Sequence, residues 1–255
     1  MPRITPVRLA CACAAALTLS LPAAASAAPA GFSTSLRVVG AGNRVLSEEV
    51  VSTHAVSVRT SHRATCFGAG TGGSGKRVPL AANTAMGVLA EASRSTAELR
   101  PLLISDHFDF GLALCGIGKS VAKGKASWYL KIDHRALSVG GEKAKVRPGD
   151  EVLWDLAPSY PYPNELVMTA PESATPGMPF TVHVFSYDEK GRRKPVAGAT
   201  VTARDGSVTG ISPTAADGST SLAISGPVVL SATHGREIPS AGVGVCAVGA
   251  PCLAE

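Results

Sequence analysis

Residues 127–156, SWYLKIDHRALSVGGEKAKVRPGDEVLWDL, decide how the first half of the chain folds. Ser127–Asp133 and Glu151–Leu156 are short and alternate in polarity, which is typical of strands with one buried face. Arg147-Pro148-Gly149-Asp150 places Pro and Gly at the two central positions of a type II turn, directly before the second strand. The stretch therefore predicts two strands, the second of which is entered through a tight turn.

The residues before this stretch predict further strands and one helix. Thr34–Val39 and Val45–Thr60 alternate as strands do, and Phe108–Gly116 is another short strand. Residues 83–92, NTAMGVLAEA, have a helical pattern that Asn83 or Thr84 can cap. The apolar face of this helix carries Met86, Leu89 and Ala90. One helix on a small mixed sheet is an α+β module.

The second half of the chain predicts strands only, after the linker Pro158-Ser159-Tyr160-Pro161-Tyr162-Pro163-Asn164, whose prolines interrupt regular structure. Turns such as Asp205-Gly206 separate the strand-like segments. The segments are Glu165–Ala170, Pro179–Tyr187, Ala199–Arg204, Val208–Ser212, Ser219–Ile224, Val228–His234 and Gly242–Val248. Seven such strands predict an all-β, immunoglobulin-like sandwich. Its expected core is Phe180, Val182, Val184, Val201, Leu222, Ile224, Val229 and Leu230.

The first 27 residues have the features of a cleavable signal peptide. Arg3 and Arg8 are followed by the apolar run Leu9–Leu21 and by Ala25-Ser26-Ala27, whose small side chains suit a signal peptidase. The run is shorter than the roughly 20 residues that span a bilayer. We expect a secreted protein with no membrane span, either free or held at the cell wall. The expected organisation is a signal peptide at 1–27, a first module at 28–158, a linker at 159–164 and a second module at 165–255.

The net charge and the number of cysteines agree with an extracellular location. Without Arg3 and Arg8, the 24 Lys and Arg residues fall to 22 against 19 acidic residues, and their scattered positions do not indicate a nucleic-acid partner. Four of the six cysteines lie beyond the signal segment, an even number that predicts two disulfides among Cys66, Cys115, Cys246 and Cys252. Three pairings are possible, and the closeness of the last two favours Cys66–Cys115 with Cys246–Cys252. No metal site is expected, because the chain has no C-x-x-C and no histidine at ligand spacing from these cysteines.

The combination of residues 128–134 (WYLKIDH), 139–141 (VGG) and 146–154 (VRPGDEVLW) resembles the transcobalamin carboxy-terminal-like domain. The resemblance implies a β-grasp-like sheet with one helix. In transcobalamins this domain covers a cobalamin held against a separate helical barrel, for which this sequence has no counterpart. The resemblance therefore implies an extracellular ligand-binding ancestry, without cobalamin or any other expected cofactor. Residues 195–218 resemble the immunoglobulin-like modules of bacterial surface proteins.

Two motifs in the first half have both a functional and a purely structural interpretation. The glycine-rich residues 68–77 match a phosphate-binding loop and a dinucleotide fingerprint, but Arg77 replaces the Ser or Thr that holds magnesium, and Val78-Pro79 interrupts the required helix. Asp133 and His134 are candidate acid–base or ligand-contacting groups, with His107 and Asp109 nearby, but no nucleophile motif accompanies them. In the structural interpretation, residues 133–135 form the polar tip of a hairpin.

The aromatic residues give the sharpest hypothesis of a site. On alternating strands Trp128 and Leu130 share one face, whereas Tyr129 and Lys131 share the other. One face is core, and the other predicts an exposed aromatic surface formed with the linker tyrosines, or a contact that holds the modules together. The candidate ligand-binding residues are Trp128, Tyr129, Asp133, His134, Trp154, Tyr160 and Tyr162.

These observations favour a secreted, non-catalytic protein that binds an extracellular small molecule or protein, or mediates adhesion. A secreted hydrolase or hydrolase accessory subunit is the rival, and it predicts an assembled Ser/His/Asp or metal cluster in a pocket. A purely structural cell-envelope protein is the third alternative, and it predicts no pocket.

Overall fold

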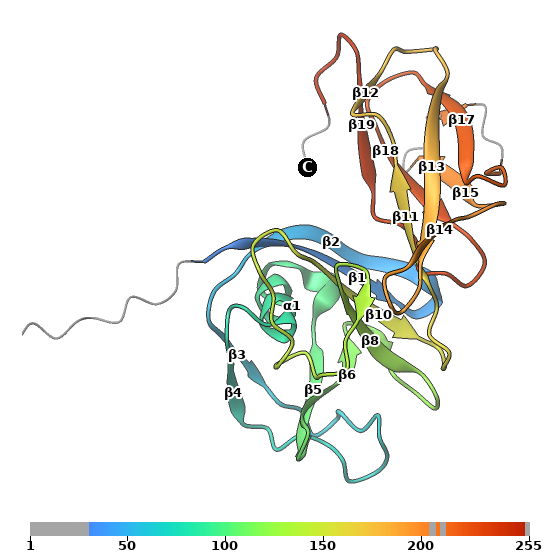
Figure 1. Ribbon diagram of the computed structural model, residues 1–255. Coiled ribbons are helices and arrows are strands. Elements are labelled where there is room, and N and C mark those ends of the chain that lie inside the picture. Colours follow the sequence, from blue (N-terminus) through green and yellow to red (C-terminus); the bar gives the residue numbers. More distant parts are fainter. Residues whose placement is uncertain (1–30, 204–207, 210–212, 253–255) are drawn as a thin grey trace, which may run out of the picture. The chain divides into compact units, whose positions relative to one another are not determined.

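The computed structural model describes residues 31–203, 208–209 and 213–252 (Figure 1). The expected signal peptide and the turn at Asp205-Gly206 lie outside these residues. Within them the fold is mostly β, with one α-helix, α1 (Ala85–Ser95), and two short 3-10 helices, η1 (Ala41–Asn43) and η2 (Ala97–Leu99). None of the helices in the described ranges is long and apolar enough to cross a membrane.

A five-stranded mixed sheet carries the predicted stretch 127–156. Its order is β2-β1-β10-β8-β9, and the central pair β1 and β10 is parallel. The strands are β1 (Ser33–Gly40), β2 (Arg44–Ser52), β8 (Ser127–Ile132), β9 (Arg135–Ala136) and β10 (Glu151–Ala157). The Arg147–Asp150 turn forms as predicted, because the Asp150 N–H donates to the Arg147 carbonyl at 3.2 Å and Gly149 takes the positive φ of +84° that a type II turn needs.

Two smaller sheets complete this half of the chain. They are formed by β3 (Val56–Arg59) with β4 (Arg77–Leu80), and by β5 (Leu102–Phe108), β6 (Gly111–Ile117) and β7 (Ser120–Val121). The strand expected at Val45–Thr60 is interrupted at Thr53, whose N–H and hydroxyl both donate to the Phe32 carbonyl. The strand expected from Phe108 begins at Gly111, because the intervening residues form the turn between β5 and β6.

The helix α1 covers the first core. Its N-cap is Thr84, whose hydroxyl oxygen accepts from the Gly87 N–H at 3.1 Å, which selects between the two predicted caps. The predicted face Met86, Leu89 and Ala90 is buried. It packs in one cluster with sheet residues that include Leu36, Val38, Leu130, Val152 and Trp154.

The second half forms two sheets around a separate core. Their orders are β11-β13-β17-β16, with β14 beside β13, and β12-β19-β18-β15. The strands are β11 (Glu165–Thr169), β12 (Ser173–Ala174), β13 (Phe180–Tyr187), β14 (Arg193–Pro195), β15 (Thr200–Ala203), β16 (Val208–Thr209), β17 (Ser219–Ile224), β18 (Val228–Thr233) and β19 (Val243–Ala247). The predicted core is buried except at two positions. Phe180 is only partly buried, and Val228 rather than Val229 faces the core because alternate residues of β18 point inward.

Both favoured disulfides are present. Cys66 pairs with Cys115 and Cys246 with Cys252, across sequence separations of 49 and 6 residues. A third, small cluster of Val39, Leu153 and Ile238 joins residues from both halves of the chain.

Candidate ligand-binding cavity

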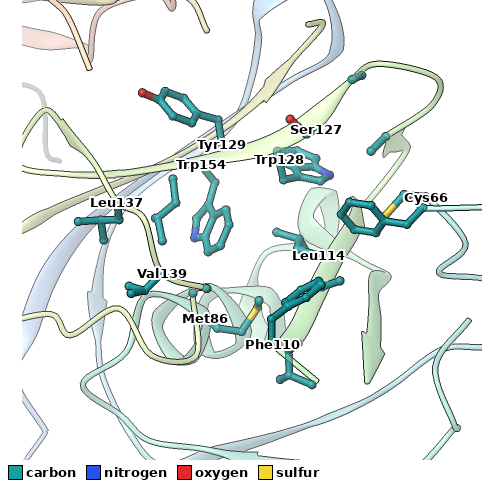
Figure 2. A pocket seen from close by; sticks show the side chains of 18 of the residues that line it. Cys66, Met86, Phe110, Leu114, Ser127, Trp128, Tyr129, Leu137, Val139 and Trp154 are labelled. Atoms are coloured by element: carbon teal, nitrogen blue, oxygen red, sulfur yellow. The ribbon is translucent and has the colours of Figure 1, made fainter. Parts of the chain in front are cut away.

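A cavity of about 230 Å³ lies beneath the two tryptophans (Figure 2). Its lining comes from α1 and from the strands β6, β8 and β10. The loops that join β3 to β4, β5 to β6 and β7 to β8, the loop after β9 and the linker before β11 supply the rest. The lining residues are Cys66, Phe67, Met86, Phe110, Leu112, Ala113, Leu114, Ala122, Ala126, Ser127, Trp128, Tyr129, Leu130, Leu137, Val139, Gly140, Gly141, Trp154 and Tyr162. An apolar, aromatic lining of this kind is typical of small-molecule sites.

The strand register places both indole rings on the side of the sheet that faces α1. Trp154 is opposite Leu130 and Trp128 is opposite Leu156, and directly opposed residues share a face. Gly141 makes room for the Trp154 ring, since a Cβ at this glycine would lie 2.6 Å from a ring carbon. Its carbonyl also accepts from the Met86 N–H at 2.9 Å, which fixes the loop to the start of α1. The loop at Gly141 therefore contacts both the Trp154 ring on the sheet and the start of α1.

The indole N–H groups of Trp128 and Trp154 are buried and have no hydrogen-bond partner among the described residues. Trp154 is 3% exposed, so its N–H is removed from bulk water. Buried donors are normally paired, and an unpaired one costs about 1–3 kcal/mol. Two unpaired donors beside an apolar cavity are the geometry expected of a site whose ligand supplies the acceptors.

Exposed apolar side chains surround the cavity. Phe67, Phe110 and Val139 line it and are 59%, 55% and 48% exposed. The rings of Phe67 and Phe110 lie 6.4 Å apart, and Phe108 stacks on Phe110 at 4.8 Å. Large exposed apolar residues that cluster in this way mark interaction sites. We call Phe67, Phe108 and Phe110 the aromatic rim.

The linker tyrosines divide between two environments. Tyr129 is 6% exposed and stacks on Tyr162 at 4.2 Å, and Figure 2 shows its hydroxyl directed away from the indole rings. The prediction that Tyr129 belongs to an exposed aromatic surface is therefore wrong, because the ring of Tyr162 covers the ring of Tyr129. Tyr160 is 76% exposed, contacts Tyr162 edge-on at 5.7 Å and does not line the cavity.

Asp133 and His134 occupy the tip of the β8–β9 hairpin, with left-handed φ angles of 48° and 66°. Asp133 Oδ1 accepts from the Glu151 N–H at 3.0 Å, which ties the tip to β10. Neither residue lines the cavity. His134 instead stacks on Tyr187 at 4.2 Å and places Nδ1 3.1 Å from the Glu165 carboxylate.

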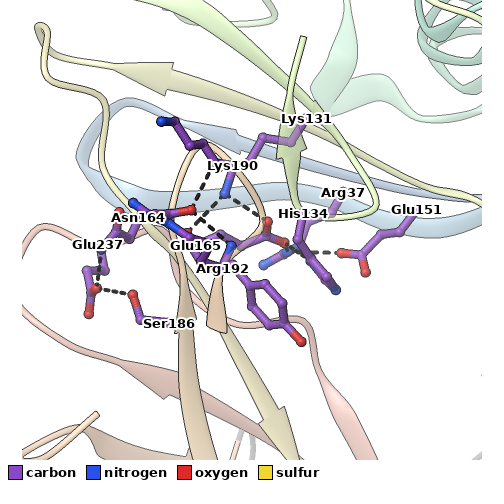
Figure 3. Close-up of polar contacts among 12 residues, drawn as sticks. Arg37, Lys131, His134, Glu151, Asn164, Glu165, Ser186, Lys190, Arg192 and Glu237 are labelled. Carbon is purple, nitrogen blue, oxygen red and sulfur yellow. Dashed lines mark hydrogen bonds and ion pairs between the residues drawn. The ribbon is translucent and has the colours of Figure 1, made fainter. Parts of the chain in front are cut away.

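Glu165, at the start of β11, is the centre of a buried charged cluster (Figure 3). Its carboxylate accepts from Arg37 Nη2 of β1 and, at 3.3 Å, from Lys131 Nζ of β8. Arg37 also donates to the Pro239 carbonyl and to Glu151 at 3.0 Å. Burial alone would raise the pKa of Glu165, but the contact with His134 and the charges of Arg37 and Lys131 outweigh it and lower the pKa to about 2.

This cluster has residue types and a spacing that could suit a metal ion. Ligand atoms of His134, Glu151 and Glu165 lie within 4.8 Å of one another. However, Arg37 already bonds both carboxylates and Lys131 bonds Glu165. These cations supply the positive charge that a metal ion would supply, so the arrangement is that of an ion-pair network.

The glycine-rich loop has a structural explanation. Asp106 accepts from the Ser74 N–H at 2.6 Å and from the Ser74 hydroxyl at 2.5 Å, and a Cβ at Gly73 would lie 2.8 Å from the Ile104 carbonyl oxygen. The loop continues into the strand β4, whereas a phosphate-binding loop opens a helix. The glycines therefore let the loop pack closely against β5.

Of the candidate ligand-binding residues, Trp128, Tyr129, Trp154 and Tyr162 line the cavity, whereas Asp133, His134 and Tyr160 do not. The other lining residues were not predicted. Phe67 and Phe110 carried a usable signal, since both are aromatic residues next to glycine or aspartate in turns. Arg37 and Glu165 carried none, because their pairing joins positions 128 residues apart. Comparison of the chain with protein-family models, with curated proteins and with solved structures found no match.

Proposed function

We propose that this is a secreted, non-catalytic binding protein that holds part of a small, largely apolar ligand in the cavity beneath Trp128 and Trp154. The observation that carries the proposal is the pair of indole N–H groups beside an apolar cavity that find no partner in the described ranges. The ligand would carry hydrogen-bond acceptors that satisfy these donors. Two disulfides favour an extracellular location.

The cavity volume limits what it can enclose. A cavity of about 150 Å³ holds a benzene molecule, whereas sites for whole drug-sized ligands measure about 300–1,000 Å³. At about 230 Å³ this cavity suits one or two fused rings. The remainder of a larger ligand would lie against the aromatic rim. The lining residues offer no carboxylate and no imidazole, which favours binding over hydrolysis.

The strand orders support the fold assigned on resemblance. A mixed sheet with a central parallel pair and one helix on a face suits a β-grasp-like, transcobalamin-C-terminal-like module. In the second half, the strand orders β11-β13-β17-β16 and β15-β18-β19 are those expected of the ABED and CFG sheets of an immunoglobulin-like sandwich, which supports that assignment. We infer that this second module serves as a spacer or adhesion unit.

The chain's two tryptophans both line the cavity, so their fluorescence reports its occupancy directly. We suggest titrating the mature protein with quinoline and with naphthalene, which share a two-ring shape but differ in one acceptor nitrogen. Each titration is followed by tryptophan emission and by thermal shift, since a ligand of the native state raises its stability. Cobalamin is a third probe because of the family resemblance. The proposal expects quinoline to bind more tightly than naphthalene.

Ala126→Phe is the matched control variant, because Ala126 lines the cavity at a half-exposed position where a ring can fill it. Binding that is equal in the wild type and in Ala126→Phe would place the probes elsewhere and contradict the proposal. An unchanged emission spectrum with every probe would favour the structural envelope alternative.

A further inference from the structure

A second groove, of about 540 Å³, lies between the β3–β4 hairpin and the C-terminal half of α1. Three arginines line it, one each from β3, β4 and α1: Arg59, Arg77 and Arg94. The other lining residues are Ala55, Val56, Ser57, Val58, Ala90, Ser93 and Leu102, so no acidic side chain lines the groove. It shares no lining residue with the aromatic cavity.

Two of the arginines are direct cross-strand neighbours. Arg59 of β3 is opposite Arg77 of β4 in the antiparallel register. Like charges in this position destabilise a strand pair by up to about 1 kcal/mol. An anion bound between the two guanidinium groups would remove that repulsion.

The guanidinium groups keep most of their donors available. Within the described part of the chain, Arg59 donates one side-chain hydrogen bond, to the Gly75 carbonyl at 3.1 Å, and Arg77 donates one, to the Ser57 hydroxyl at 3.4 Å. Each guanidinium has five N–H donors in a planar fork that matches an oxyanion. Arg94, in the last turn of α1, is paired with Glu91 at 3.2 Å, so the net charge at the groove remains positive.

We propose that this groove binds a phosphate group of an extracellular molecule through Arg59 and Arg77, with Arg94 as a third positive charge. A phosphate group carries enough charge and enough acceptor oxygens to engage two guanidinium forks at once. This site is independent of the proposed apolar ligand, because neither arginine contributes to the aromatic cavity.

The test is calorimetric titration of the mature protein with inorganic phosphate and with linear polyphosphate, at ionic strength held constant with sodium chloride. Arg59→Gln/Arg77→Gln is compared with Arg44→Gln/Arg63→Gln, which removes the same charge from two exposed arginines outside the groove. We expect saturable binding that weakens at least about ten-fold in the first double variant and is retained in the second. Thermal unfolding in phosphate-free buffer checks that both variants fold.

Tighter binding of polyphosphate, lost in the groove variant, would assign the site to phosphate groups repeated on a polymer. Equal binding per phosphate would assign it to single phosphate groups. Absence of saturable binding to both probes, or an equal loss in both double variants, would overturn the proposal.

Discussion

Glu165 is a 1% exposed carboxylate whose partners Arg37, Lys131 and His134 all belong to the other half of the chain. Removing one partner of a buried ion pair leaves the others uncompensated and typically costs about 3–5 kcal/mol. We therefore expect Glu165→Gln to lower the free energy of unfolding by about 3 kcal/mol in urea denaturation at pH 7. Glu172→Gln, at an exposed position, should have little effect.

The same substitution should change the acid limb of the stability profile. The folded pKa of Glu165 is about 2, below its unfolded value of 4.5, so its contribution is present above pH 4.5 and is lost as the pH falls toward 2. Wild-type stability should fall across that window more steeply than the stability of Glu165→Gln. Parallel profiles would show that the buried pairs do not lower this pKa.

Asp155 behaves in the opposite way. Its Oδ2 atom is buried without a partner among the described residues, and burial raises the pKa of its carboxyl to about 7 despite the nearby charges of Arg37 and Lys131. The folded state therefore binds a proton more tightly than the unfolded state, and stability falls as the pH rises from about 4 to about 7.

We expect Asp155→Asn to be more stable than the wild type at pH 8 by about 1–3 kcal/mol, because an amide carries no charge to bury. The difference should shrink toward pH 4, where the wild-type carboxyl is protonated in the folded state. Chemical denaturation at several pH values measures it. A variant that is less stable at pH 8 would mean that the ionised carboxylate is needed by Arg37 or Lys131.

At the scale of single elements, the N-terminus of α1 depends on one hydroxyl. Thr84 accepts from the Gly87 N–H and donates to the Ala81 carbonyl at 2.9 Å. Loss of an N-cap hydroxyl costs about 0.5–2 kcal/mol, so Thr84→Ala should lower the unfolding free energy by about 1 kcal/mol. Thr84→Ser retains the hydroxyl and should recover most of the loss. An equal loss in both variants would assign the effect to packing of the buried methyl group.

The strand predictions were accurate where the polarity pattern was clear and failed at a strand of the first half. Ser219–Ile224 was predicted with the observed bounds, since every second residue is buried. Leu102–Phe108 was not predicted, although it forms β5 with three buried residues in succession. Burial of consecutive residues comes from neighbours on both sides, and a period-two pattern does not report it.

At the scale of the whole molecule, the two disulfides differ in the length of chain they close. The Cys66–Cys115 disulfide closes a loop between residues that are 49 positions apart. The Cys246–Cys252 disulfide closes a loop between residues that are 6 positions apart. In the chain-entropy model these loops are worth about 4 and about 2 kcal/mol. Replacement of each pair by alanine, followed by urea denaturation, should show the larger loss for the first pair. Equal losses would indicate that loop entropy is not the dominant contribution.

The sequence alone determined the features that depend on residues close together in the chain. The turn at Arg147–Asp150, the capped helix and most strands of the second half follow from local preference and from polarity patterns of fixed period. Trp128 and Trp154 were also selected from the sequence as candidate ligand-binding residues, and alternation along the strand assigned Trp128 to the face opposite Tyr129. The disulfide pairing was favoured by simple separation along the chain.

Only the tertiary structure decided which of these features meet. The cavity needs Phe67, Phe110, Met86 and Gly141 beside the tryptophans, and the opposition of Arg59 to Arg77 depends on strand register. Partnerships between distant residues are set by how whole elements pack, a result of the summed burial of many apolar side chains rather than of any local signal. Glu165 is the clearest example: nothing beside it in the sequence indicates that the fold surrounds this carboxylate with Arg37, Lys131 and His134.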